Sequence, residues 1–392
     1  MVNFDEIIDR KKSYCAKWDS QPEEINDDRL IPLWVADMDF KVAQPIEKAI
    51  EKCVKHGIYG YATIPESYHE AIISWMERRH QFKVDKDWIV LTPGVVTALK
   101  IAVQAYSQVD DAVLVFKPVY YPFDFSIELN KRKLVECPLI RKENHYEIDL
   151  EDLETKIKEN DVKLIILCNP HNPVGKVFTQ EELYQIGMIC KKYQVKVIVD
   201  EIHQDFVFGN HQHIPFYNVD ESFKDFSIIC TAPSKTFNLA GLQTSNIIIA
   251  NENMRKQFIE VKEANGINDP QLFGMVACMS AYNECELWVD EMLEYINDNF
   301  IYLDQFLKAN MPEIKMMDHE GLYLAWIDFT AMNMTHQELE EFMLKKAHLW
   351  LDEGYIFGTG GAGFERFNLA LPRSQLEKVC QQLLIAYKEK SR

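Results

Sequence analysis

Short apolar runs recur through the middle of the chain, with helical patterns between them. Five of these runs occupy residues 113–116, 163–168, 195–199, 227–230 and 246–250. The stretch between the second and third runs carries Leu183, Ile186 and Ile189 at helical spacing. Strands that are apolar on both faces are typical of a parallel sheet covered by helices on each side. The pattern therefore predicts an α/β fold.

The last third of the chain has a different pattern. Its expected elements are a long helix over 286–307, strands over 321–329 (alternating and half-buried), 350–357 and 366–371, and a closing helix over 374–387. This mixture predicts a small α+β domain. A length of 392 residues allows such a satellite beside one large domain. The predicted domains are a large one over 46–280 and a small one formed by 1–45 and 281–392.

The composition excludes several classes of function. The chain has 42 Lys and Arg against 61 Asp and Glu, and this net charge of −19 disfavours general binding to nucleic acid or to an anionic membrane. No apolar run approaches the roughly 18 residues of a membrane span, and the charged start lacks the apolar core of a signal peptide. The nine cysteines form no C-x-x-C pair, so we expect reduced thiols in the cytoplasm and no metal site.

Polar side chains follow two of the expected strands. The sequence Asn-Pro-His-Asn-Pro-Val-Gly occupies 169–175, and Asp200 to His203 follow the next run. Ligands of open α/β sheets bind beyond the carboxyl ends of the strands, so Asn172 and Asp200 are candidates for a ligand site. Taken singly, the loop also fits a rigid turn, and Asp200 also fits a helix N-cap.

Three further features lie after expected strands. Lys235 follows the fourth run, and a lysine desolvated there would be a nucleophile toward an aldehyde, although a lysine reaching out to solvent fits equally well. Gly94 begins an amphipathic stretch whose free N–H groups suit a phosphate, a plain helix start being the alternative. The pair Tyr120 and Tyr121 suits either stacking on an aromatic ring or core packing.

The features become specific only as a set. Pyridoxal 5′-phosphate needs a lysine for its aldehyde, a carboxylate for its pyridine nitrogen and a donor for its ring oxygen. It also needs an aromatic side chain against its ring and a helix N-terminus for its phosphate. The ends of successive strand-like segments offer all five groups. The sequence therefore predicts a pyridoxal-phosphate site.

Over essentially its whole length the chain resembles the fold-type I pyridoxal-phosphate enzymes of aminotransferase class I/II. The motifs that carry this resemblance are those at 92–94, 169–175, 200–203 and 234–237. Within that group it resembles the C–S β-lyase branch of MalY and PatB, on the motifs Trp-Val-Ala-Asp-Met-Asp-Phe at 34–40, Tyr-Gly-Tyr at 59–61, Tyr-Tyr-Pro at 120–122 and the stretch 200–205. The resemblance implies a mixed, mostly parallel seven-stranded sheet between helices, a small α+β domain built from both termini, and a homodimer.

The resemblance also implies roles at the cofactor ring. Lys235 is expected to bond to the aldehyde and to move the proton at the substrate α-carbon. Asp200 is expected to pair with the pyridine nitrogen, and Asn172 to donate to the ring oxygen. Tyr120 would stack on the ring, and His203 would lie beside it.

The remaining implied roles concern the phosphate and the substrate. The phosphate would be held by the backbone at Gly94, Val95 and Val96, by the Ser234 hydroxyl, and by Tyr61 from the neighbouring subunit. The substrate would be held by Arg366, which would fork onto its α-carboxylate, and would lie against Tyr121 and Ala36.

Two positions depart from the aminotransferase pattern. Gln243 stands where many members have an arginine that contacts the phosphate, so one cation is missing. His203 stands where many have a tyrosine; an imidazole can also donate a hydrogen bond, but its protonation state varies near neutral pH. Both changes alter the surroundings of the ring, so a transaminase role does not follow automatically.

The resulting hypothesis is a carbon–sulfur β-lyase. It would cleave cystathionine, cysteine or cystine by α,β-elimination to a thiol or sulfide, pyruvate and ammonia. One alternative is an amino-acid aminotransferase, which shares the removal of the α-proton. Another alternative, of a different class, is a regulatory protein that acts through protein contacts.

Overall fold

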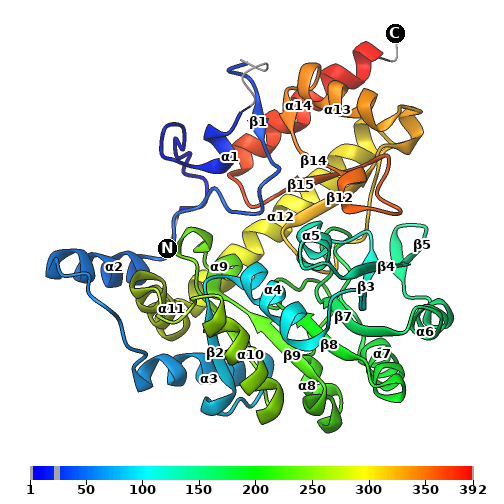
Figure 1. Ribbon diagram of the computed structural model, residues 1–392. Helices are drawn as coiled ribbons and strands as arrows, with labels where there is room; N and C mark the ends of the chain where they lie inside the picture. Colours follow the sequence, from blue (N-terminus) through cyan, green and yellow to red (C-terminus); the bar gives the residue numbers. More distant parts are fainter. Residues whose placement is uncertain (1–2, 22–26, 391–392) are drawn as a thin grey trace.

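A seven-stranded sheet forms the centre of the computed structural model, which describes residues 3–21 and 27–390. Its strand order is β2-β10-β9-β8-β7-β3-β4 (Figure 1). The strands are β2 (Ile89–Thr92), β3 (Ala112–Lys117), β4 (Lys133–Pro138), β7 (Val162–Cys168), β8 (Lys196–Asp200), β9 (Ser227–Thr231) and β10 (Ser245–Ile248). Strand β10 is antiparallel to both neighbours, while the other pairs are parallel. The predicted mixed, mostly parallel α/β sheet is confirmed.

The apolar runs divide their side chains between the two faces of this sheet. In β7, Leu164 and Ile166 pack into one core cluster, whereas Ile165 and Leu167 pack into another. One face is covered by α4 (Val95–Tyr106), α5 (Pro122–Glu128) and α10 (Glu252–Ala264), and the other by α3 (Glu66–His80), α6 (Leu150–Glu159), α7 (Gln180–Tyr193) and α8 (Phe216–Val219). Each buried aliphatic side chain contributes roughly 1.5–3 kcal/mol, which explains why the runs lack polar alternation.

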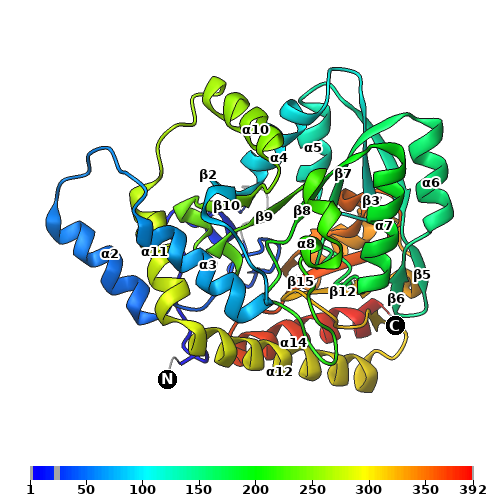
Figure 2. The ribbon, with the colours of Figure 1, turned by 90° about the horizontal axis from the view of Figure 1, so that it is seen from below.

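A smaller four-stranded sheet of order β11-β12-β15-β14 accompanies the large one. Its strands are β11 (Lys315–Met316), β12 (Leu324–Asp328), β14 (Asp352–Glu353) and β15 (Phe364–Asn368). The helices α12 (Glu286–Asn310) and α14 (Arg373–Lys390) run side by side there (Figure 2), with α13 (His336–Lys345) nearby. Strand β1 (Ile31–Pro32) pairs with β13 (Leu349–Trp350), so the start of the chain joins this C-terminal region.

Two strand predictions in this region are wrong in detail. The stretch 350–357 forms parts of two strands, β13 and β14, in different sheets, followed by a 3-10 helix over Gly354–Phe357. Gly354 allows that helix because a Cβ there would meet the carbonyl oxygen of Gly361 at 2.1 Å. The stretch 321–329 forms a strand only over Leu324–Asp328, because Leu322 has a φ of 72°, and that strand is buried throughout rather than half-buried.

The remaining elements lie around these two sheets. They are α1 (Ala16–Asp19), α2 (Gln44–His56), β5 (Ile140–Lys142), β6 (His145–Glu147), α9 (Pro233–Thr236) and α11 (Leu272–Glu284). Helix α2 projects from the body, and an extended loop leads from it to α3 (Figure 1). Within residues 3–21 and 27–390, none of the helices combines the length and apolar character needed to cross a membrane.

Candidate active site

A cavity of about 350 Å³ lies beyond the carboxyl ends of β7, β8 and β9. The predicted site residues that line it are Ala36, Gly94, Val95, Val96, Tyr120, Asn172, Asp200, His203, Ser234 and Lys235. Residues far apart in the sequence meet here because parallel strands end at the same edge of a sheet. Tyr61, Tyr121 and Arg366 do not line the cavity. Gln243, which stands in the position of a phosphate-contacting arginine, lines it, as do Thr97 and Ala240, which the sequence does not predict there.

Asp200 is the last residue of β8, where its carboxyl group is buried with 4% of the residue exposed. The strand register places it between Cys168 and Cys230. Burial raises the pKa of Asp200 to about 7, because the Ile202 N–H at 3.1 Å and the charge of Lys235 offset only part of the desolvation cost. A protonated pyridine nitrogen beside this carboxylate would favour its charged form.

Lys235 lies on α9, the short helix that follows β9. Its Nζ donates to the carbonyl oxygen of Ala36 at 2.7 Å. Burial, together with the positive charge of Arg366, lowers the pKa of Lys235 to about 8. A useful fraction of neutral amine is therefore present near neutral pH, as nucleophilic attack on an aldehyde requires.

The N-terminus of α4 also lines the cavity. Gly94 caps this helix with a φ of 97°, which favours glycine. A Cβ at Gly94 would meet no atom of the described residues within 4 Å, so the space in front of the helix is open. The first N–H groups of an α-helix have no intrahelical partner, and Ser234 lines the same space. These groups fit a phosphate.

The surroundings of His203 disfavour its protonation, contrary to the predicted change of protonation near neutral pH. Its ring is buried, and burial together with the charges of Lys235 and Arg366 lowers its pKa well below the usual value. Its Nδ1 has no hydrogen-bond partner among the described residues. This unpartnered nitrogen, in a residue that lines the cavity, also fits a bound polar group.

Arg366 lies behind the cavity on β15, buried against three acceptors. It forms an ion pair with Asp352, its direct partner on β14. It also donates to the Asn172 side-chain oxygen at 3.0 Å and to the Trp34 carbonyl oxygen at 2.7 Å. Arg366 does not line the cavity itself, but its hydrogen bond to Asn172 connects it to a residue that does.

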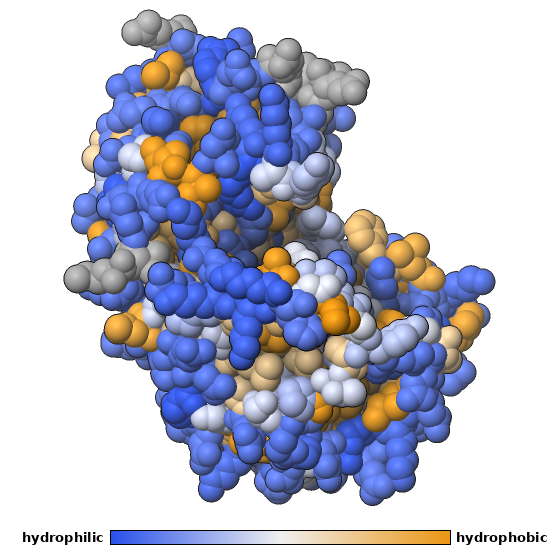
Figure 3. Space-filling model, turned by 90° about the vertical axis from the view of Figure 1, so that its left-hand side faces the viewer, coloured by the Kyte–Doolittle hydropathy of each residue, from blue (hydrophilic) through white to orange (hydrophobic). Residues whose placement is uncertain are grey.

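Two predicted tyrosines lie outside the cavity. Tyr121 packs its ring 5.5 Å from that of Tyr120 and 5.9 Å from that of Phe357. Tyr61 is 95% exposed, in the loop between α2 and α3. That side of the molecule shows hydrophobic areas within a mainly hydrophilic surface (Figure 3). In the single chain, Tyr61 therefore lies away from the cavity that Asp200 and Lys235 line.

The segment 34–40, here called the strap, lines the cavity through Ala36. The Ala36 carbonyl oxygen accepts from the Tyr323 hydroxyl at 2.7 Å as well as from Lys235. The Asn368 amide donates to the carbonyl oxygens of Val35 and Asp37 at 2.7 and 2.5 Å. The motif at 34–40 is visible in the sequence, whereas no local sequence pattern marks the residues that support it.

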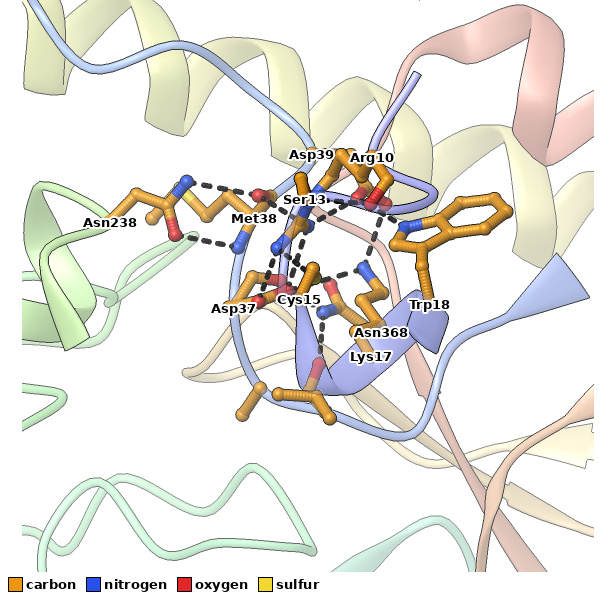
Figure 4. A network of polar contacts seen from close by, with 12 residues as sticks. Arg10, Ser13, Cys15, Lys17, Trp18, Asp37, Met38, Asp39, Asn238 and Asn368 are labelled. Atoms are coloured by element: carbon orange, nitrogen blue, oxygen red, sulfur yellow. Dashed lines mark hydrogen bonds and ion pairs between the residues drawn. The ribbon is translucent and has the colours of Figure 1, made fainter. Parts of the chain in front are cut away.

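Ion pairs hold the outer side of the strap (Figure 4). The Arg10 guanidinium lies 2.6 Å from the Asp37 carboxylate and 2.5 Å from that of Asp39. The Lys17 side chain is 0% exposed, and its Nζ lies 2.7 Å from Asp39. Burial raises the pKa of Asp39, but the charges of Lys17 and Arg10 outweigh it and leave that pKa below its usual value.

Asn238 ties the strap to the segment that carries Lys235. Its side-chain oxygen accepts from the Met38 N–H at 3.0 Å, and its side-chain nitrogen donates to the carbonyl oxygens of Met38 and Phe40 at 2.9 and 3.0 Å. Asn238 lies three residues after Lys235. The strap and the lysine segment are therefore fixed to each other directly.

The fold and these residues define a pyridoxal-phosphate-dependent enzyme of fold type I. The chain belongs to the aminotransferase class I and II family, whose model matches residues 30–383. Cystathionine beta-lyase PatB of Bacillus subtilis is 41% identical over 376 residues, which cover 96% of this chain and 97% of that protein.

Solved structures give the same result. Cystalysin of Treponema denticola, which contains pyridoxal 5′-phosphate, matches with a TM-score of 0.96 and 40% identity over 99% of both chains. The pyridoxal-phosphate-bound C–S lyase of Staphylococcus hominis matches with a TM-score of 0.92 and 33% identity, also over 99% of both. The predicted family, fold and cofactor are confirmed.

Proposed function

We propose that the protein is a C–S β-lyase that cleaves S-substituted cysteines such as cystathionine, cysteine or cystine. The products are pyruvate, ammonia and a thiol or sulfide. The observation that carries the proposal is the amine of Lys235, with a pKa lowered to about 8, in one cavity with the carboxyl group of Asp200. The lyase names of relatives that match over the whole chain favour this reaction over transamination.

When bound, pyridoxal phosphate supplies an aldehyde for the substrate amine and a ring that takes up the electron pair of the broken Cα–H bond. In the proposed reaction, Lys235 removes the α-proton, and Asp200 keeps the pyridine nitrogen protonated. The Cβ–S bond then breaks, and the sulfur leaves with the bonding electrons. The released enamine takes up water to give pyruvate and ammonia.

Two residues are proposed to hold the substrate. Arg366 binds the α-carboxylate beside Asn172, to which it already donates. Tyr121 does not line the cavity, but its ring packs against that of Tyr120, which does, and its hydroxyl is proposed to act on the leaving sulfur. Burial raises the pKa of Tyr121, so its hydroxyl stays protonated and is available to donate to the departing thiolate.

We further propose a homodimer in which the partner subunit's Tyr61 reaches the phosphate. The exposed Ile58 and Tyr59 beside Tyr61 support an interface there. The test mixes unfolded Tyr61→Ala and Lys235→Ala chains and refolds them together. Hybrid dimers would hold one intact site, so we expect about a quarter of wild-type activity from the two inactive parents. A mixture as inactive as its parents contradicts the shared site.

The reaction is tested with cystathionine or cysteine and no keto acid. We expect release of pyruvate and of thiol or sulfide in equal amounts, and none with Lys235→Ala. Turnover that starts only when a keto acid is added would make the protein an aminotransferase. A cellular effect that Lys235→Ala leaves intact, in a protein with no turnover, would indicate the regulatory alternative.

A further inference from the structure

A chain of buried polar side chains lies next to Lys235, outside the cavity. The Thr236 hydroxyl donates to Asp205 Oδ2 at 2.6 Å, and Asp205 Oδ1 lies 2.9 Å from Nε2 of His80. All three residues are buried. Thr236 ends α9, Asp205 lies in the loop after β8, and His80 ends α3. Three separate elements therefore meet at one carboxylate.

We propose that Asp205 is a positioning residue that sets the placement of Lys235 by holding Thr236. The inference rests on the proposed role of Lys235. Helix α9 has only four residues, and a single helical turn is not stable by itself. A hydrogen bond from its last residue to an ionised carboxylate is roughly twice as strong as a neutral one. This bond anchors the turn that carries the lysine.

Asp205 is ionised in this setting. Burial alone would raise its pKa, but the charge of His80 and the hydrogen bonds from His80 and Thr236 leave the pKa below its usual value. Both carboxylate oxygens have partners, so the group has one orientation. An anchor of this kind can hold the backbone at 235–236 without touching the cofactor or the substrate.

A second buried pair connects this anchor to the strand that carries Asp200. The rings of His80 and His213 lie 5.7 Å apart, edge to face. His213 Nε2 lies 3.1 Å from Glu201 Oε2, and Glu201 directly follows Asp200. The two acid–histidine pairs therefore support both the proposed lysine and the proposed ring-nitrogen partner from behind.

The positioning role makes a prediction about the Lys235 amine. Burial and the charge of Arg366 lower its pKa, while the charges of Asp37, Asp200 and Asp352 raise it and offset only part of that effect. A turn released from Asp205 would let the amine reach more water, so its pKa would rise toward that of an ordinary lysine. The neutral fraction at a given pH would then fall.

The test compares Thr236→Val, which keeps the shape and removes the hydroxyl, with Thr236→Ser, which keeps the hydroxyl. Cofactor-stripped protein is mixed with pyridoxal 5′-phosphate at several pH values, and covalent capture is fixed with borohydride. For Thr236→Val we expect capture at pH 7.5 about fivefold slower, a pH midpoint higher by about half a unit, and kcat about tenfold lower with KM within twofold. Thr236→Ser should stay within twofold of wild type.

Asp205→Asn supplies a second variant in case Thr236→Val does not fold, and it should shift the capture midpoint in the same direction. The positioning role would be overturned if Thr236→Val, Thr236→Ser and wild type had equal capture rates and equal pH midpoints of capture and differed only in thermal stability. Capture by Lys235→Ala as strong as by wild type would instead contradict the proposed role of Lys235 itself.

Discussion

The two walls of the candidate site are built in different ways. The inner wall consists of residues such as Asn172, Asp200 and Lys235 that follow strands of one sheet, so the hydrogen-bonded ladder determines their places. The strap takes almost no part in strand-to-strand backbone hydrogen bonding. Its carbonyl groups are held by side chains such as Asn238 and Asn368. Changes behind the strap can therefore move Ala36 while leaving the inner wall intact.

The largest expected effect comes from the inner wall. Lys235→Ala should lower the proposed lyase activity by about 10³–10⁴-fold, because the proposed general base and the proposed covalent attachment point are both lost. Folding should be unaffected in circular dichroism, and borohydride should fix no cofactor. Lys196→Ala removes a partly buried lysine that does not line the cavity, and it should keep both properties.

Asp200→Asn tests the same wall without removing the lysine. An amide cannot carry the charge that stabilises a protonated ring nitrogen, so we expect kcat to fall by about 10²–10³-fold. Borohydride should still fix the cofactor on Lys235, which separates this effect from loss of the lysine. Activity within threefold of wild type would contradict the role given to Asp200.

Lys17→Met tests the strap. Among the residues that the structure describes, it leaves two partly buried carboxylates with Arg10 as their one remaining ion-pair partner, and we expect the free energy of unfolding to fall by about 3 kcal/mol in urea. Lys41→Met is the matched control, because it breaks an exposed pair with Glu6 and should cost less than about 1 kcal/mol. Equal losses in the two variants would show that the ion pairs of Lys17 do not hold the strap.

The smallest effect concerns the sheet that supports the strap through Arg366. Burial raises the pKa of Glu353 to about 7 from 4.5, and Glu353 lies directly opposite Glu365. Between those two pH values the folded protein binds more protons than the unfolded chain, so stability decreases as pH rises. Glu353→Gln should flatten this decrease and equal wild type near pH 4.5. An unchanged slope in urea midpoints from pH 4.5 to 7 would contradict the buried ionisation.

The inner wall of the site could be predicted from the sequence, whereas the supports of the strap could not. Asn172, Asp200 and Lys235 each follow an apolar run in the sequence, so the strand pattern alone brought them to one edge. Tyr323 and Asn368 reach the strap from about 290 and 330 residues away, and nothing near them in sequence marks that contact. The lowered pKa of His203 also depends on burial by distant segments, so the residues next to it in the sequence do not predict that shift.

The way the strap is held has a consequence for biosynthesis. Three of its supports, Tyr323, Arg366 and Asn368, leave the ribosome about 290 to 330 residues after the strap. The sheet that carries Asp200, together with the helix α9 that carries Lys235, is complete once residue 248 has emerged. A nascent chain therefore has the proposed cofactor-binding wall, and the Asn238 contacts that tie the strap to it, before Tyr323, Arg366 and Asn368 can fix the carbonyl groups of Trp34 to Asp37.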